Sequence, residues 1–521
     1  MSFQGRISET GKQTVQCVLN VSSQPNAPSD PRPLRMGVPF GPEQVREENR
    51  LRLCQEGKSL VLQQRVLDRW PDGSARWVLL DWISPPGQVE VSLSSPTERT
   101  VPEHVLQVKE RADGVVVDTG CAEFCVSTGT NIPFASVQQQ ETTLLASGGS
   151  AIRTTDQQGR VHQAVADSVR VLEQGPVRAA VLLEGALAPA LDNRLLFACE
   201  LHFFAGRPEV EIRLSVHNSN PASHPGGMWD LGQEGSVFLQ EVAVVFDLQC
   251  GNQAVVQLSP EPDASLVEGQ TVELYQDSSG GENWDSTCHV NRDNTVPLQF
   301  RGYRLHVDQD ESKGLRATPT MVVRQPGRCL AVTMEHFWQN FPKALSWDGQ
   351  NLSVGLWPGQ FADLHELQGG ERKTHVFMVS LGDELELEDL NWARSPARAA
   401  IDPDWVAATG VIPYLLPEKQ DPHEQYKQLV WAALDGEDTF LAKRERVDEY
   451  GWRHFGDMYA DHEAVYYDGP DELVSHYNNQ YDGIWGLGVQ FLRSGDIRWF
   501  EQMQELAMHV SDIDIYHTDG D

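Results

Sequence analysis

The chain has 521 residues, with 41 Lys and Arg against 75 Asp and Glu, which gives a formal net charge of −34. Domains commonly contain roughly 100–200 residues, so this length predicts two to four of them, each with a real core. A charge of this sign repels nucleic acid and anionic membrane surfaces, and it argues against both as partners.

The N-terminus and the cysteines bear on location and metal binding. Residues 1–13 have no apolar core of the signal-peptide kind, and no apolar run of about 18 residues could span a bilayer. We therefore expect a soluble, cytoplasmic protein. Of the eight cysteines only Cys121 and Cys125 lie close together, without a second pair to complete a zinc site. We expect buried thiols and no cofactor, and the sequence leaves a need for a divalent cation such as calcium open.

Residues 13–395 have the pattern of strands separated by Gly, Pro, Asn and Asp. In "EVEIRLSVHN" the apolar residues Val210 to Val216 alternate with polar ones, as a half-buried strand requires. Many such runs without interleaved long helices predict antiparallel sandwiches or barrels. Pro and polar residues cluster at 95–105, which predicts a domain boundary there. "RWPDGSARW" predicts a tight hairpin between Trp70 and Trp77.

The periodicity becomes helical after residue 395. "HEQYKQLVWAALDG" has apolar residues at helical spacing from Tyr426 to Leu434. "WGLGVQFLRSGDIRWFEQMQELAMHV" predicts two helices joined at Gly495, with Asp496 as the N-cap of the second. The predicted apolar face of that second helix comprises Ile497, Phe500, Ala507 and Val510. A helical array needs several stacked pairs, so we expect the chain to end part-way through its last domain.

Four segments carry a family resemblance. They are "RWPDGSARWVLLDW" (69–82), "HPGGMWDLG" (224–232), "FWQNFPKALSWDG…LWPGQFADLHELQGGERKTH" (337–375) and "YGWRHFGDMYADHE…SHYNNQYD" (450–482). In this order they resemble the PcRGLX/YetA-type family, the exo-rhamnogalacturonan lyases and their relatives in polysaccharide lyase family 26.

The resemblance implies three domains and a reaction. The domains would be an N-terminal RIFT-type β-barrel (1–98), a central antiparallel β-sandwich (99–395) and the first helices of an incomplete (α/α) toroid (396–521). The reaction would be exo-acting β-elimination at a galacturonic acid residue of a pectin-type glycan, with the site between sandwich and toroid. The implied partner is a glycan substrate. The oligomeric state stays undefined.

Elimination at a uronic acid needs a cation or donor on the C6 carboxylate, a base for the C5 proton and an acid for the departing oxygen. The stretch 450–482 contains residue types for all three roles. The catalytic candidates are His476, Tyr477 and His454. The candidates for binding substrate are Arg453, Asn478, Asn479, Gln480, Asp457, His462, Lys343 and Lys373. The structural alternative is that these polar groups satisfy one another where sandwich and toroid meet.

Other functions remain open. A carboxylate pair among Asp457, Asp461 and Glu463 would suit a glycoside hydrolase on the same scaffold, although a hydrated acidic rim is the simpler interpretation of each. A non-catalytic glycan-binding or truncated relative is the third alternative. No Walker-type loop, HExxH or GxSxG motif is present in the sequence.

Two further segments have simple structural predictions. In "HELQGGERKTH" we expect Gly369 and Gly370 to form a turn in a hairpin with solvated charges. The alternative is that the segment reaches across to the toroid and lends Lys343 or Lys373 to bind a substrate carboxylate. "DIDIYHTDGD" fails the EF-hand template because a hydrophobic residue stands where glycine is required. We expect a helix end and a loop there, with His517 a weak site candidate.

Overall fold

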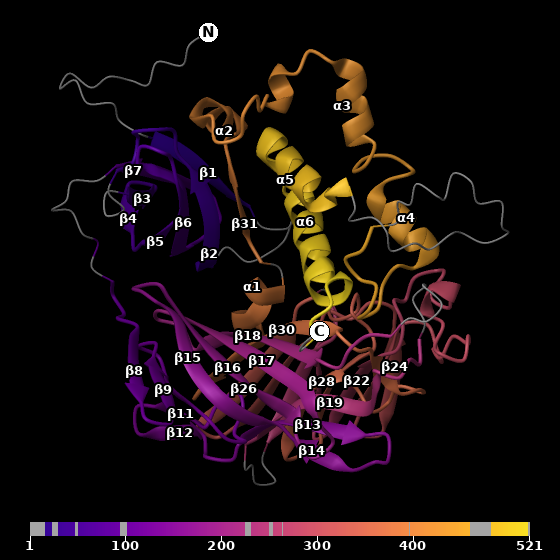
Figure 1. The fold of residues 1–521 in the computed structure, drawn as a ribbon. Coiled ribbons are helices and arrows are strands. Elements are labelled where there is room, and N and C mark those ends of the chain that lie inside the picture. Colours follow the sequence, from indigo (N-terminus) through magenta and orange to yellow (C-terminus); the bar gives the residue numbers. More distant parts are fainter. Residues whose placement is uncertain are drawn as a thin grey trace, which may run out of the picture.

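The computed structural model contains five antiparallel sheets and a small helical region (Figure 1). It describes residues 16–22, 30–46, 51–93, 100, 102–223, 231–248, 254–262, 264–394, 396–458 and 481–518. The mainly β architecture followed by helices agrees with the fold class predicted from the sequence.

Two sheets form the N-terminal domain. The five-stranded sheet has the order β31-β1-β7-β3-β4 and the three-stranded sheet the order β2-β6-β5. Their strands are β1 (Gln16–Ser22), β2 (Arg32–Pro39), β3 (Leu51–Gln55), β4 (Lys58–Leu60), β5 (Gln63–Arg69), β6 (Ala75–Ser84), β7 (Gly87–Leu93) and β31 (Arg398–Ile401). The hairpin predicted between Trp70 and Trp77 is confirmed as the β5–β6 turn. Within the described residues no strand pairing joins the two sheets, so the barrel is open in its hydrogen bonding.

Strand β31 follows the last strand of the sandwich in the chain and belongs to the N-terminal domain. Leu19 of β1 pairs with Ile401 of β31, and the register continues to Ser22 and Arg398. The residues of β31 were expected in the helical domain. Their pairing instead makes them an edge strand of the first sheet, so the chain passes through this domain before the helix Pro403–Thr409 begins.

The central region contains a small sheet and two large ones. The small sheet runs in the order β12-β11-β10-β9-β8. Its strands are β8 (Gln107–Arg111), β9 (Gly114–Asp118), β10 (Glu123–Ser127), β11 (Ser136–Gln139) and β12 (Thr142–Leu145). The two large sheets have nine strands each and share one hydrophobic core, which is the predicted β-sandwich.

The first large sheet has the order β14-β13-β19-β28-β27-β22-β23-β24, with β29 paired to β19. Its strands are β13 (Ser150–Asp156), β14 (Val161–Gln163), β19 (Val237–Asp247), β22 (Val272–Gln276), β23 (Tyr303–Val307), β24 (Asp310–Gly314), β27 (Lys343–Trp347), β28 (Asn351–Trp357) and β29 (His365–Leu367).

The second large sheet has the order β15-β16-β17-β18-β30-β26-β25-β20-β21. Its strands are β15 (Val165–Gln174), β16 (Arg178–Ala188), β17 (Asp192–Phe204), β18 (Glu209–Asn218), β20 (Val255–Ser259), β21 (Val267–Gly269), β25 (Thr320–Gln325), β26 (Arg328–Met334) and β30 (Arg372–Gly382). The alternation predicted for β18 is confirmed, since Val210, Ile212, Leu214 and Val216 are all buried.

The turn at Gly369 and Gly370 corrects one expectation. Gly370 has φ of 82°, as a turn requires, but the flanking strands do not form a hairpin. β29 pairs with β19 in one large sheet, whereas β30 pairs with β18 and β26 in the other. The turn therefore carries the chain across the sandwich. The flanking charged and imidazole side chains are buried instead of solvated, and they include His365, Glu366, Glu371, Lys373 and His375.

The helical region follows the sandwich. Its α-helices are α1 (Asn391–Arg394), α2 (Pro403–Thr409), α3 (Glu424–Trp431), α4 (Phe440–Val447), α5 (Gly483–Ser494) and α6 (Ile497–His509), and a π-helical turn, η7 (Val510–Asp514), continues α6. The predicted α5–α6 hairpin is confirmed. Gly495 ends α5 with φ of 74°, and the Asp496 carboxylate caps α6 by accepting the N–H of Arg498 at 3.0 Å. These helices close no ring within the described residues.

The most buried face of α6 differs from the predicted one. The predicted residues Ile497, Phe500 and Val510 are only half-buried. The face that packs most deeply holds Trp499, Gln502, Leu506 and His509. Apolar periodicity misplaces the face because two of its four members, Gln502 and His509, are polar.

One hydrophobic core joins the N-terminal domain to the helices. It contains Leu19 and Val38 from the first sheets together with Phe491, Trp499 and Leu506 from the helical hairpin. The helices therefore pack on the N-terminal domain, and η7 also contributes Ile513 to the core of the sandwich. In Figure 1 the N-terminal domain and the helices lie side by side above the sandwich.

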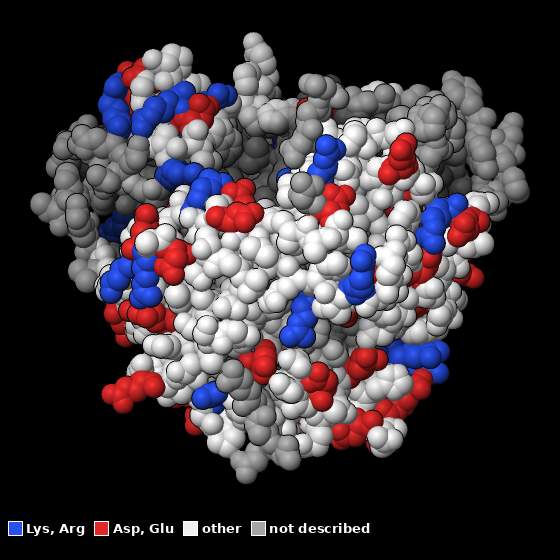
Figure 2. All heavy atoms as spheres, turned by 60° about the horizontal axis from the view of Figure 1, so that its bottom comes forward, with Lys and Arg blue, Asp and Glu red and all other residues white. Residues whose placement is uncertain are grey.

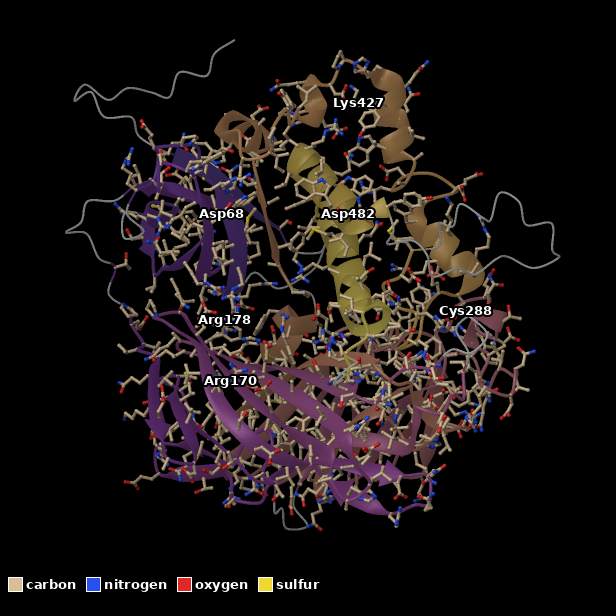
Figure 3. All side chains as sticks on the ribbon, in the orientation of Figure 1. Asp68, Arg170, Arg178, Cys288, Lys427 and Asp482 are labelled. Atoms are coloured by element: carbon tan, nitrogen blue, oxygen red, sulfur yellow. The ribbon has the colours of Figure 1, made fainter. Side chains whose placement is uncertain are left out.

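A polar cluster connects the N-terminal domain to the sandwich. Arg35 lies 2.7 Å from Asp81 and 2.6 Å from Glu173, which belongs to β15 of the sandwich. Gln63 of β5 accepts the backbone N–H of Arg178 at 2.8 Å. Figure 3 labels Arg178 at this junction. The two domains are thus joined by ion pairs as well as by chain connectivity.

The surface shows mixed charge. On the face in Figure 2, acidic and basic side chains are interspersed. Within the described part of the chain, no helix is long and apolar enough to cross a membrane.

Candidate functional site

An open pocket lies between the loops of the sandwich and the turn that follows α4. It encloses about 620 Å³ of space, part of it continuous with solvent. Most of its lining comes from residues 289–292, 297–298, 361–366 and 450–454. These segments are far apart in sequence, so the pocket exists only in the folded chain.

Two of the predicted site residues line this pocket. Arg453 and His454 lie in the turn 450–454 that begins the motif-rich stretch. The Arg453 guanidinium stacks on the Trp452 ring at 4.5 Å from its centroid, and its Nε lies 3.2 Å from Oε1 of Glu371. Another Arg453 nitrogen donates to the backbone carbonyl of Glu366. The guanidinium is therefore held in one orientation at the pocket wall.

A second arginine, Arg292, also lines the pocket. Arg292 pairs with Asp363 at 3.0 Å, and Asn291 donates to the same carboxylate at 2.7 Å. Burial opposes ionisation of Asp363, but the hydrogen bonds from Asn291 and Leu364 and the nearby Arg292 outweigh it and lower the pKa of its carboxyl. Neither Arg292 nor Asp363 was predicted from the sequence to be a site residue.

His289 is a third pocket residue that sequence analysis missed. Its Nε2 lies 2.7 Å from Oδ2 of Asp448, whose side chain is fully buried. The ring packs edge-on against Phe341 at 5.1 Å and lies 6.3 Å from the His454 ring. Cys288, its neighbour in the chain, is labelled below α4 in Figure 3. His289 and Asp448 are 159 residues apart, and no motif links them in the sequence.

The two predicted lysines lie inside the sandwich and not in this pocket. Lys343 is 1% exposed, and its Nζ donates to the carbonyls of Asn340, Pro342 and Leu356 at 2.7–3.2 Å. Burial, and then the charge of Lys373, lower the pKa of Lys343 well below its usual value. Lys343 lines a smaller cavity of about 270 Å³.

Lys373 is also buried, with 4% of its surface exposed. Burial lowers the pKa of its ammonium to about 8, although Asp512 opposes this shift. In this arrangement neither lysine reaches the open pocket.

Asp457 lies in the helical region, outside the pocket. It is 1% exposed, its Oδ1 accepts the N–H of Met458 at 2.7 Å, and its Oδ2 lies 3.7 Å from Nε2 of His509. The other candidate residues fall outside the described residues and stay predictions.

These are His462, His476, Tyr477, Asn478, Asn479 and Gln480, together with Asp461 and Glu463 of the hydrolase alternative.

His517 belongs to a structural contact. Its N–H donates to the carbonyl of Gly370 at 2.8 Å, and its carbonyl accepts from the His217 ring. These bonds attach the chain after η7 to the turn between β29 and β30. Among the described residues, no group of three or more His, Cys, Asp and Glu side chains is arranged to hold a metal ion.

Comparison with protein families finds a match in the first domain. Residues 21–80 match the model of the PcRGLX-like N-terminal RIFT barrel domain. These residues cover β2 to β5 and most of β6, the greater part of the first domain described above. The predicted resemblance to the PcRGLX-type family is thereby confirmed for this domain. None of the curated proteins matches the chain by sequence.

Solved structures show only distant likeness. An α-mannosidase from Enterococcus faecalis V583 is 10% identical, with a TM-score of 0.40 over 75% of this chain and 46% of that one. A galactose mutarotase related enzyme from Lactobacillus acidophilus is 10% identical, with a TM-score of 0.26 over 54% of this chain and 100% of that one. The chain spans about half the length of the mannosidase. These low scores support no inference about this chain.

Proposed function

We propose that the chain is a carbohydrate-active protein that takes an acidic, pectin-type glycan into the pocket and cleaves it by β-elimination at a galacturonic acid residue. The N-terminal family match supports the link to glycans. The observation that carries the proposal is that Arg292, Arg453, His289 and His454 line one open pocket. These are the cation and proton-transfer groups that elimination needs.

The pocket lining includes groups for binding both the charge and the rings of an acidic sugar. Arg292 and Arg453 present planar guanidinium groups, which bind a carboxylate through two parallel hydrogen bonds. Phe361 and Trp452 supply aromatic surface for the apolar faces of sugar rings. Since both arginines are already oriented by carboxylates, little side-chain freedom would be lost on binding.

A second candidate is non-catalytic glycan binding. Both guanidinium groups are balanced by carboxylates, Asp363 for Arg292 and Glu371 for Arg453. Such a pocket also suits a neutral sugar. Its hydroxyl groups can form hydrogen bonds with both members of an arginine–carboxylate pair, so the pocket needs no net positive charge.

Incubation with rhamnogalacturonan oligosaccharides distinguishes these functions. Elimination forms a C4–C5 double bond that absorbs in the ultraviolet, hydrolysis forms reducing ends without that absorbance, and simple binding gives heat of association without products. We expect the unsaturated product. Reducing ends without absorbance would support the hydrolase alternative.

Two arginine variants link the activity to this pocket. Arg292→Ala and Arg453→Ala are expected to raise KM for the acidic glycan at least tenfold, because each removes a charged partner of the carboxylate. Arg170→Ala is the matched control, since Arg170 pairs with Glu184 on the exposed surface of the sandwich (Figure 3). Unchanged KM in both pocket variants would place the site elsewhere.

A further inference from the structure

The residue that ends α4 joins two loops of the sandwich. Asp448 follows α4 with φ of 56°, a left-handed conformation that aspartate tolerates better than most residues. Its side chain is completely buried. One carboxylate oxygen accepts the Ser279 hydroxyl and the other faces His289 Nε2 at 2.7 Å. Both oxygens thus have fixed partners, and the carboxylate has one orientation.

The two ring nitrogens of His289 have different surroundings. A carboxylate oxygen accepts, so the nitrogen facing Asp448 carries the hydrogen and Nδ1 keeps its lone pair in the neutral ring. Within the described part of the chain, Nδ1 has no hydrogen-bond partner. The ring lines the open pocket, and its side chain is 6% exposed. Nδ1 is therefore the nitrogen left for a ligand.

This arrangement has the parts of a general base. A buried carboxylate fixes the tautomer and orientation of an imidazole and stabilises the imidazolium that forms when the ring accepts a proton. Ser279 fixes the carboxylate in turn. The nearby His454 ring and the two arginines place cationic and polar groups around the space in front of His289.

We propose that His289 is the proton acceptor of this pocket, and that Asp448 and Ser279 are its positioning residues. The assignment rests on the proposed function. Nδ1 takes the C5 proton of the uronic acid, and the electron pair of the C5–H bond becomes the second bond between C4 and C5. The C4–O bond breaks with its electrons on the oxygen, which takes a proton from water. The hydroxide formed then removes the proton from His289.

The first test is His289→Gln. The glutamine amide retains a donor toward Asp448 but offers no base, so the loop remains attached to α4. Turnover of rhamnogalacturonan oligosaccharides should fall by about 10²-fold or more in kcat, while KM stays within about threefold. His306→Gln is the matched control, because His306 is an exposed histidine on β23. An unaltered thermal midpoint shows that the fold is intact.

Chemical rescue separates proton transfer from a structural role. In His289→Ala, added imidazole should restore part of kcat, since it can occupy the space and accept the proton. Asp448→Asn turns an acceptor oxygen into a possible donor and favours the wrong tautomer, so kcat should fall with little change in KM. A merely structural pair would give lower stability without imidazole rescue.

The outcomes are distinct. Wild-type turnover that persists in His289→Gln overturns the assignment and leaves the proposed function standing. A loss confined to KM also overturns it, because His289 would then only bind. Wild-type protein that binds the oligosaccharide without forming an unsaturated product overturns the proposed reaction itself, and the role of His289 with it.

Discussion

Arg453 and Glu371 form an ion pair of 3.2 Å between the turn after α4 and the turn that crosses the sandwich. Glu371 is 1% exposed, and its other oxygen accepts the N–H of Gln368 at 2.7 Å. The carboxylate therefore both shapes the crossing turn and balances the charge of the arginine at the pocket wall. The negative charge of Glu371, and of a protein with 75 acidic residues as a whole, opposes the binding of an anion to Arg453.

Replacing Glu371 by glutamine tests whether the charge of Glu371 weakens the binding of an anion at Arg453. The amide oxygen can still accept from Gln368, but one negative charge beside Arg453 is gone. We expect affinity for galacturonate oligosaccharides to rise about tenfold at low salt, which corresponds to ~1.4 kcal/mol, and less at high salt because ions screen the interaction. Calorimetric titration at two salt concentrations measures the effect.

Two controls accompany this variant. Glu384→Gln removes a charge from an exposed position and should leave affinity unchanged. A neutral oligosaccharide should bind wild type and Glu371→Gln equally. If affinity rose equally for charged and neutral sugars, the cause would be a changed conformation of the turn and not the lost charge.

Lys373 predicts a specific dependence of stability on pH. Burial lowers the pKa of Lys373 to about 8 from 10.5. Below pH 8 both folded and unfolded chains carry the charge, and its burial costs stability in full. Between pH 8 and 10.5 the unfolded chain binds more protons, so the free energy of unfolding rises with pH, by on the order of 3 kcal/mol from this group.

The variant Lys373→Met should remove that rise and be more stable than wild type at pH 7. Urea unfolding of both proteins from pH 7 to 10 gives the difference, in which the titration of other groups cancels. Lys109→Met changes an exposed lysine on β8 and should run parallel to wild type. A constant difference between Lys373→Met and wild type across this range would contradict the prediction.

The local elements were predictable because their signals are short-range. Alternation over Val210–Val216 defines β18, and Gly495 followed by Asp496 defines the break between α5 and α6, since turn and cap chemistry needs only neighbouring residues. The crossing of the chain at Gly370 was not predictable. A glycine turn between two strands has the same local pattern whether the strands pair with each other or join opposite sheets.

Some residues of the site were also predictable from the sequence, and others were not. Arg453 and His454 were found because they lie in a motif-rich stretch, and they do line the pocket. His289 ends the short 3-10 helix Thr287–His289 and Arg292 lies in the loop that follows, where the sequence has no periodic pattern. Their partners Asp448 and Asp363 are distant in sequence. The burial of Lys343 depends on three carbonyls supplied by the surrounding strand and loop. Only the packed structure shows that this lysine is enclosed.

The shared core predicts that the N-terminal domain and the helices unfold together. Leu506 of α6 is fully buried in the core that also contains Leu19 and Val38. Leu506→Ala removes apolar contacts and leaves a cavity, so we expect a loss of about 2–5 kcal/mol. Hydrogen exchange should then accelerate in β1 and β7 as well as in α5 and α6.

The control for this cavity is Leu172→Ala. Leu172 of β15 is 43% exposed, so its truncation should change stability by less than about 1 kcal/mol. Faster exchange confined to α5 and α6 in Leu506→Ala would show that the helices open independently of the first domain.

Gly281 gives a fine test of where Asp448 must lie. A Cβ at Gly281 would stand 3.0 Å from Oδ1 of Asp448 and 3.2 Å from the Ser279 hydroxyl, so Gly281→Ala must displace this carboxylate by a few tenths of an ångström. The other oxygen of this carboxylate lies 2.7 Å from Nε2 of His289. We therefore expect kcat to fall several-fold while KM is unchanged, because small misplacements of catalytic groups are costly. The thermal midpoint should fall only slightly.

Gly486→Ala is the matched control, since a Cβ there meets nothing within 4 Å. It lies inside α5 and should raise stability by about 0.5–1 kcal/mol without altering kcat. If Gly281→Ala left kcat at the wild-type value although its carboxylate contact had demonstrably shifted, the orientation of Asp448 would not control the reaction, and His289 would act without it.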